Sequence, residues 1–219
     1  MTVPPDLVLA ERPAAGEPEG LLVLHHGRGT SEQDLLPLAD ELDPQRRLHV
    51  AAPRGPLQLP GWPGFHWYAV PRVGYPDPAT YAAAYAALAR VHDALWARTG
   101  IGPERTVLSG FSMGSVMSYA LGLGPDRPRP AGLLIHAGFI PTVPGWEPDL
   151  AHRRGLPVRI SHGTADPIMD VAFAHDARER LTAAGLDVRY AEHAGAHHLS
   201  PTDAPAGRAF LGEVLPSGA

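Results

Sequence analysis

The sequence predicts a three-layer α/β fold, in which a mostly parallel central sheet carries helices on both faces. Two observations lead to this prediction. Short apolar runs alternate with longer helix-like runs along the chain, which is the pattern of strands joined by crossover helices. A serine flanked by glycines stands directly between one of these strands and the helix that follows it.

The individual elements follow from the apolar runs and from the residues that end them. Strands are expected at 20–26, 48–53, 105–111, 132–138, 157–162 and 187–193, and helices at 31–42, 78–98, 113–123, 168–184 and 203–214. Ser31 is the candidate N-cap of the first helix, with Asp34 at the capping-box position. No repeat, linker or domain boundary stands out, so residues 1–219 are expected to form a single domain.

Ser112 is the candidate nucleophile. It is the centre of Gly110-Phe111-Ser112-Met113-Gly114, which follows a predicted strand and precedes a predicted helix, as in a nucleophile elbow. In such a turn the hydroxyl projects above the sheet edge, and the two glycines let strand and helix pack closely. The motif arises by chance in about one such sequence in ten. The motif alone therefore leaves open the alternative that Ser112 is only a small residue at a tight turn, and candidate partners downstream are needed to support a catalytic role.

Candidate partners for the serine follow two later strands. A serine hydroxyl needs an imidazole to take its proton and a carboxylate to orient that imidazole. Asp166 is the leading carboxylate, with helix capping as its alternative role and Asp170 as the fallback. His197 is the leading base, and His198 is the alternative. The chain order serine, aspartate, histidine is that of α/β-hydrolases.

The segment after the first predicted strand is expected to contribute to an oxyanion hole. The backbone amides of Arg28 and Met113 are the candidate donors, because two fixed N–H groups stabilise a tetrahedral intermediate by about 3 kcal/mol each. Gly27 and Gly29 would let the backbone approach the substrate closely. The Arg28 side chain has two alternative roles, contact with an anionic substrate group or a solvated surface charge.

Four segments together resemble the phospholipase/carboxylesterase branch of the α/β-hydrolases, which includes acyl-protein thioesterases and small bacterial carboxylesterases. These segments are His26-Gly27-Arg28-Gly29, Gly110-Phe111-Ser112-Met113-Gly114, His162-Gly163-Thr164-Ala165-Asp166 and Gly195-Ala196-His197. The resemblance spans nearly the whole chain. It implies that Ser112, Asp166 and His197 form the triad and that the amides of Arg28 and Met113 form the oxyanion hole. The family usually has Gly-x-Gly-His in the last segment, and this departure leaves His198 open. Dimers occur in the family, so the resemblance also leaves a homodimer open.

Two irregular segments, 54–78 and 139–157, are expected to cover a substrate pocket. Both contain aromatic residues among prolines and glycines, and apolar pockets of this kind hold acyl chains or aromatic esters. The candidate pocket residues are Gly27, Trp67, Tyr68 and Ile168. The alternative is that these aromatic side chains cover the core beneath long loops.

Composition excludes several other classes of chemistry. The chain has no cysteine, which excludes disulfides, thiolate metal sites and a cysteine nucleophile. All 18 basic residues are arginine, so Walker-type phosphate loops, Schiff bases and serine–lysine dyads are excluded as well. A net charge of -5 without a basic stripe disfavours nucleic acid as a partner. Zinc bound by His193, His197 and His198 is disfavoured, because no nearby carboxylate set completes such a site.

Residues 1–19 lack the charged start and apolar core of a secretory signal, and no apolar run approaches the length of a membrane span. A cytoplasmic protein is therefore expected. Its predicted function is a serine hydrolase that cleaves small-molecule carboxylic esters through an acyl-enzyme, with no metal and no organic cofactor. The alternatives are a thioesterase or acyltransferase on the same triad, a non-catalytic ligand-binding module, and a peptidase, the last disfavoured because no lid or propeller domain is present.

Overall fold

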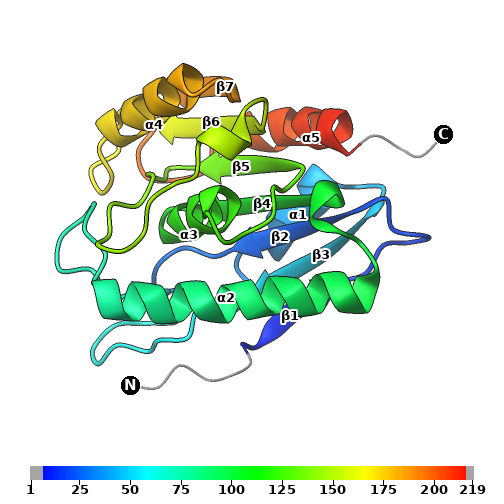
Figure 1. The fold of residues 1–219 in the computed structure, drawn as a ribbon, viewed down its shortest axis with the longest axis horizontal. Coiled ribbons are helices and arrows are strands. Elements are labelled where there is room, and N and C mark those ends of the chain that lie inside the picture. Colours follow the sequence, from blue (N-terminus) through cyan, green and yellow to red (C-terminus); the bar gives the residue numbers. More distant parts are fainter. Residues whose placement is uncertain (1–6, 216–219) are drawn as a thin grey trace.

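A computed structural model describes residues 7–215 of the chain. Within this range a seven-stranded sheet has the order β1-β3-β2-β4-β5-β6-β7 (Figure 1). All neighbouring strands are parallel except β1, which runs antiparallel to β3. The strands are β1 (Leu9–Arg12), β2 (Gly20–His25), β3 (Leu48–Pro53), β4 (Thr106–Phe111), β5 (Gly132–His136), β6 (Pro157–Gly163) and β7 (Asp187–His193). The helices are α1 (Leu36–Leu42), α2 (Pro78–Thr99), α3 (Met113–Leu123), α4 (Ala172–Ala183) and α5 (Asp203–Val214).

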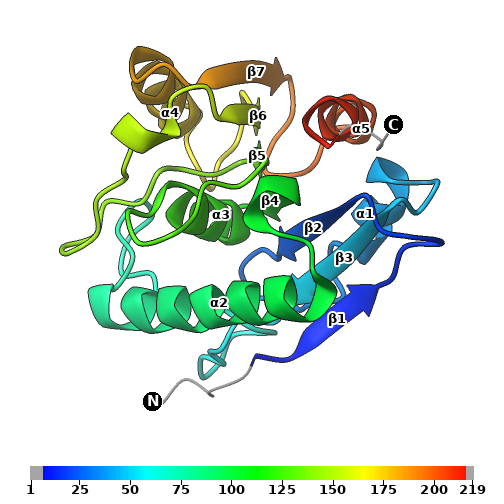
Figure 2. The same cartoon turned by 45° about the vertical axis from the view of Figure 1, so that its right-hand side comes forward.

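Helices cover both faces of the sheet and bury its central strands. Helices α2, α3 and α4 lie on one face and α1 and α5 on the other, as Figure 2 shows. Alternate residues of β2 therefore enter different cores: Leu21 and Val23 face the first group of helices, and Leu22 and Leu24 face the second. This arrangement confirms the predicted α/β fold class.

Helix α2 shows how local sequence sets the bounds of an element. The Asp77 side chain accepts a hydrogen bond from the Thr80 amide at 2.9 Å, and Pro78 occupies the first turn, where no amide donor is needed. Gly100 ends the helix in the left-handed conformation, with φ of 68°. The predicted end of this helix is one residue short of the observed end.

Near the N-terminus the structure differs from the sequence prediction at one strand and one helix. Strand β1 was not predicted, since Glu11 and Arg12 interrupt a very short apolar run. Helix α1 begins at Leu36 rather than at residue 31, because Pro37 supplies no amide hydrogen for a preceding helical turn. Residues 31–35 form turns instead, and Ser31 accepts a weak hydrogen bond from the Gln33 amide without capping a helix.

Helix α4 also begins later than predicted, at Ala172 instead of residue 168. Asp170 precedes it, and its side chain accepts the Ala172 amide at 2.9 Å. Within residues 7–215, no helix combines the length and the apolar character needed to cross a membrane.

Candidate active site

The candidate catalytic residues meet at one edge of the sheet. Strands β2, β4, β6 and β7 are parallel, so their carboxyl ends lie at the same edge, where ligands bind in open α/β sheets. Arg28, Ser112, Asp166 and His197 each lie a few residues beyond one of these ends. Residues far apart in sequence are thereby brought into one site.

Ser112 occupies a strained turn between β4 and α3. Its φ of 55° and ψ of -121° belong to a region of backbone conformation that residues other than glycine rarely adopt. A Cβ atom on Gly110 would lie 2.4 Å from the Gly114 carbonyl carbon, and one on Gly114 would lie 1.9 Å from the His25 carbonyl oxygen. Both glycines are thus required for strand and helix to approach this closely. The Ser112 amide donates to the His136 carbonyl at 2.9 Å, which helps to hold the turn.

Three side chains form a continuous hydrogen-bonded chain. His197 Nε2 lies 2.8 Å from Ser112 Oγ, and His197 Nδ1 lies 2.6 Å from Asp166 Oδ2. Asp166 is an acceptor when ionised, so the Nδ1 atom carries the proton and Nε2 is free to accept from the serine hydroxyl. The ring of Phe111 packs beside His197, with 4.9 Å between ring centroids. This is the arrangement by which an imidazole activates a serine.

The Asp166 carboxylate is fully buried and held from both sides. Burial by itself would raise the pKa of Asp166, but hydrogen bonds from the Met169 amide, His197 and the Ile168 amide lower it below its ordinary value. His162 Nε2 lies 3.4 Å from Asp166 Oδ2 and donates to the Met169 carbonyl at 2.8 Å. The carboxylate therefore stays ionised and fixed in orientation.

The sequence alternatives to Asp166 and His197 lie elsewhere. His198 is exposed, packs beside the tilted ring of His193 at 5.3 Å between ring centroids, and contacts the Leu199 carbonyl rather than Ser112. Asp170 precedes α4 and binds a backbone amide there. Asp166 caps the turn at 168–169 and not a helix. Its Oδ1 atom accepts the amides of that turn while its Oδ2 atom contacts His197, so the two roles coexist. No group of three metal-ligating side chains is present in the described part of the chain.

Neither of the two amides predicted for the oxyanion hole has a hydrogen-bond partner among the residues that the structure describes. Met113 is the first residue of α3, and an amide in the first turn of a helix has no partner inside the helix. The Arg28 amide makes no hydrogen bond to another group of residues 7–215. The neighbouring Gly29 amide donates to the Phe65 carbonyl at 2.9 Å, which fixes the loop that carries Arg28.

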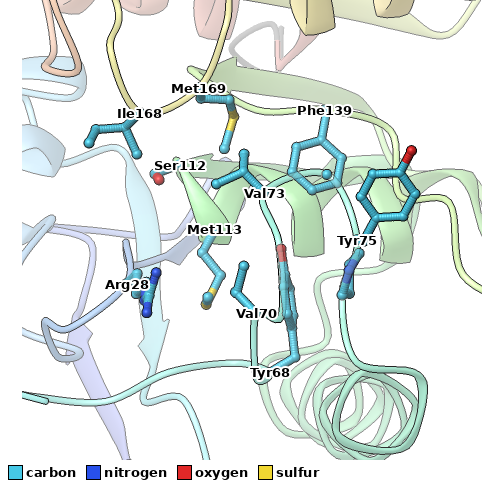
Figure 3. Close-up of a pocket in the computed structure, with 12 residues that line it drawn as sticks. Arg28, Tyr68, Val70, Val73, Tyr75, Ser112, Met113, Phe139, Ile168 and Met169 are labelled. Carbon is cyan, nitrogen blue, oxygen red and sulfur yellow. The ribbon is translucent and has the colours of Figure 1, made fainter. Parts of the chain in front are cut away.

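A small cavity of about 40 Å³ opens beside Ser112 (Figure 3). In this view Arg28, Ser112 and Ile168 lie toward one end of it, and Phe139 and Tyr75 lie toward the other. The lining residues are Arg28, Tyr68, Val70, Val73, Gly74, Tyr75, Pro76, Ser112, Met113, Phe139, Ile168 and Met169. Burial raises the pKa of Tyr68, so its phenol stays protonated.

Two predicted pocket residues do not line the cavity. Trp67 is completely buried, and its Nε1 atom donates to the His26 carbonyl at 2.9 Å, so it supports the loop after β2. Gly27 is buried against the ring of Phe111. The predicted pocket residues that do line the cavity are Tyr68 and Ile168.

The two loop segments contribute unequally to this cavity. Segment 54–78 supplies six of the lining residues, whereas 139–157 supplies Phe139 alone. Trp146 in the latter segment is buried near Tyr81 of α2, away from Ser112, and so fits the alternative of core coverage. Val70, Val73 and Met169 also line the cavity, although no sequence motif points to them. Their only signal was their position inside or next to segments already assigned to the pocket.

Histidines buried behind the elbow form a second polar cluster. His25 Nδ1 lies 2.8 Å from Ser118 Oγ of α3, and His25 Nε2 lies 3.3 Å from His92 Nε2 of α2. Burial lowers the pKa of both imidazoles, that of His92 to about 3. The pair is therefore uncharged and ties the strand end before Arg28 to the two helices that pack on it.

Comparisons with known proteins agree with this geometry. Acyl-protein thioesterase 1 of Gibberella zeae is 34% identical over 125 residues, which cover 54% of this chain and 52% of that relative, so the match spans about half the relative's length. Acyl-protein thioesterase 1 homolog 1 of Dictyostelium discoideum is 20% identical over 205 residues, covering 89% of this chain and 90% of that protein.

Solved structures show the same fold. The Bacillus cereus carboxylesterase has a TM-score of 0.82 at 22% identity and covers 95% of this chain and 94% of its own. Esterase PE8 has a TM-score of 0.81 at 27% identity and covers 95% of this chain and 99% of its own. The sequence profile of the phospholipase/carboxylesterase family matches residues 11–210, a range that contains the elbow, Asp166 and His197. The chain therefore belongs to the phospholipase/carboxylesterase family, as its four motifs predict.

Proposed function

We propose that this protein hydrolyses carboxylic esters through an acyl-enzyme formed on Ser112. The observation that carries the proposal is the hydrogen-bonded chain from Ser112 through His197 to Asp166, with distances of 2.8 and 2.6 Å. A hydroxyl in this position can lose its proton at the moment of attack. Family membership and the names of the related carboxylesterases and thioesterases support the same chemistry.

The geometry supports a two-step reaction. His197 Nε2 takes the proton as Ser112 Oγ bonds to the carbonyl carbon, and the amides of Arg28 and Met113 stabilise the negative oxygen that forms. His197 then gives its proton to the leaving alcohol as the ester bond breaks. Water enters, loses a proton to His197 and releases the acid, and Ser112 recovers its hydrogen. Asp166 stays ionised throughout and stabilises the imidazolium.

The cavity favours substrates with short acyl groups. Its volume is about 40 Å³, enough for a few water molecules, so we expect the acyl groups that it encloses to be short. Apart from Arg28, its lining carries no charged side chain. A small-molecule ester is thus the proposed partner. A cytoplasmic location remains a prediction from sequence, and a homodimer remains an open possibility from the family resemblance.

Hydrolysis of p-nitrophenyl esters from acetate to laurate tests this proposal. We expect the highest kcat/KM at acetate to butyrate, and a loss on the order of 10⁴-fold or more in Ser112→Ala and His197→Ala. His198→Ala is the matched control, because it removes the adjacent exposed imidazole and should keep wild-type activity. Folded protein without turnover of any ester, or His198→Ala as inactive as His197→Ala, would overturn the assignment.

Thioester hydrolysis is the second candidate, favoured by the two acyl-protein thioesterase relatives. The same attack by Ser112 would cleave a thioester, and acyl transfer would result if an alcohol replaced water. Matched acyl esters and thioesters, assayed with and without added alcohol, separate these reactions by their products. Labelling of Ser112 by a fluorophosphonate without turnover of either substrate would point to a binding module instead.

A further inference from the structure

Arg28 places an unpaired positive charge in the cavity beside the nucleophile. Its side chain lines the same cavity as Ser112, and in Figure 3 the two residues lie on the same side of it. Within residues 7–215 the guanidinium forms no ion pair and donates no hydrogen bond, and its buried Nε atom has no partner. A guanidinium has five N–H donors and cannot lose its charge in a protein. The Nη donors have no partner among the described residues, so they are the ones that a ligand could use.

Three other partly or fully buried arginines have charged or carbonyl partners within the protein, which the Arg28 guanidinium lacks in the described part of the chain. Arg12 pairs with Asp43 at 2.7 Å, Arg54 binds both oxygens of Glu32 at 2.5 and 2.6 Å, and Arg153 donates to three backbone carbonyls. The chain as a whole has a net charge of -5, so a general excess of positive charge does not explain an unpaired arginine. No carboxylate lines the cavity to neutralise it.

The Arg28 side chain is also held in place. Its guanidinium lies over the ring of Trp62, with 3.9 Å between the Cζ atom and the ring centroid. Trp62 is 54% exposed and belongs to segment 54–78, which supplies half of the residues that line the cavity. Stacking uses the face of the guanidinium and leaves its Nη groups, at the edge, without a partner in residues 7–215. An aromatic side chain that would otherwise be an exposed apolar surface thus acts as a platform for the charge.

We propose that Arg28 selects esters that carry a carboxylate within a few atoms of the scissile carbonyl. This inference rests on the proposed ester hydrolysis and deepens it by naming a substrate class. A carboxylate matches the planar donor edge of arginine and can accept two parallel hydrogen bonds from it. The short distance follows from the small cavity, in which the same residue supplies both the charged side chain and a candidate oxyanion amide. Half-esters of short dicarboxylic acids have this form.

Matched substrate pairs test the inference. Monoethyl succinate is compared with its neutral primary amide, which has the same shape, and this pair places the charge in the acyl half. A second pair, 4-acetoxybenzoate and 4-acetoxybenzamide, places it in the leaving group. In at least one of the two pairs, the one whose carboxylate reaches Arg28, we expect kcat/KM to be about 10- to 100-fold higher for the carboxylate than for the amide. This is the range for a charge-assisted hydrogen bond. High salt should reduce this preference.

Variants assign the preference to the side chain. Arg28→Gln should abolish it, and Arg28→Lys should keep part of it, because lysine retains the charge but not the planar fork. The ratio within a pair is the readout, since it cancels changes in folded fraction or in the backbone amide. Arg178→Gln is the matched control: Arg178 lies over the Tyr190 ring at 4.7 Å and does not line the cavity. This control should keep the wild-type ratio.

Three results would overturn the inference, and they differ from failure of the proposed function. Wild-type protein that cleaves the neutral esters without preferring either carboxylate refutes it and leaves the hydrolase assignment intact. A preference that survives in Arg28→Gln, or that disappears equally in Arg178→Gln, refutes the role of Arg28. If no ester is cleaved and a fluorophosphonate does not label Ser112, the proposed function itself is wrong, and the inference fails with it.

Discussion

Lowering the pH should destabilise the folded protein through histidines that are buried without charge, and His92 allows this effect to be measured at one residue. Its ring is completely buried between α2 and the end of β2 and contacts His25. Burial first, and then the nearby Arg127, lower the pKa of His92 to about 3 against the opposing effect of Asp93.

The direction of this pH effect depends on whether the folded or the unfolded state binds the proton. In the unfolded chain histidine has a pKa of about 6.5, so between about 3 and 6.5 the unfolded state binds the proton that the folded state rejects. The free energy of unfolding is then largest above pH 6.5 and falls as the pH decreases. Protonation of His92 in the unfolded chain at pH 5.0 lowers the free energy of unfolding by RT ln(1 + 10^1.5), and the corresponding contribution at pH 7.5 is negligible. Between pH 7.5 and pH 5.0 this one group therefore lowers the free energy of unfolding by about 2 kcal/mol.

Urea unfolding at pH 7.5 and pH 5.0, followed by circular dichroism, measures the effect. We expect the difference in free energy of unfolding between the two pH values to be about 2 kcal/mol smaller in His92→Gln than in wild type. His198→Gln, which removes an exposed imidazole, should leave the difference unchanged. Equal pH dependence in wild type and His92→Gln would refute the reasoning, whatever the stability of the variant at pH 7.5.

Three further predictions concern the elbow and the histidine loop. Gly114→Ala should lower the free energy of unfolding by about 3 kcal/mol or more in the same urea assay, because its Cβ would meet the His25 carbonyl oxygen; unchanged stability would contradict the close packing. Ser112→Gly should be about 1 kcal/mol more stable than Ser112→Ala, both lacking the hydroxyl, since only glycine tolerates the φ of 55°; equal melting temperatures would show that the turn is unstrained. Asp203→Asn should reduce kcat about tenfold or more with little change in KM, because the buried carboxylate accepts the Ser200 amide at 2.6 Å and so anchors the loop of His197; wild-type kcat would dismiss this anchoring role.

The parts of the fold that the sequence predicted are those fixed by local chemistry. The strand before Ser112 is a short apolar run, and Gly110 is needed for the close approach of Gly114, four residues along the chain. The central parallel strands β2, β4 and β5 are likewise mostly apolar, because helices bury both of their faces. Such signals are present in the chain before any long-range contact forms.

The parts that it missed depend on distant partners. Strand β1 includes a charged residue that points inward, and Arg12 is tolerated there only because Asp43, far along the chain, pairs with it. Trp67 and Tyr68 are adjacent aromatic residues, yet only the second lines the cavity, since the first donates to the His26 carbonyl. Periodicity and composition contain no information about either contact.

The Asp166 carboxylate contributes both to proton transfer and to the shape of the substrate cavity. One oxygen orients the imidazole of His197, and the other accepts the amides of Ile168 and Met169, whose side chains form part of the cavity wall. A change at this position therefore alters the shape offered to the substrate together with the speed of its conversion. Attempts to retune acyl-chain selectivity would do better to begin at Val70 or Val73, on the opposite loop, where the wall is independent of the proton-transfer machinery.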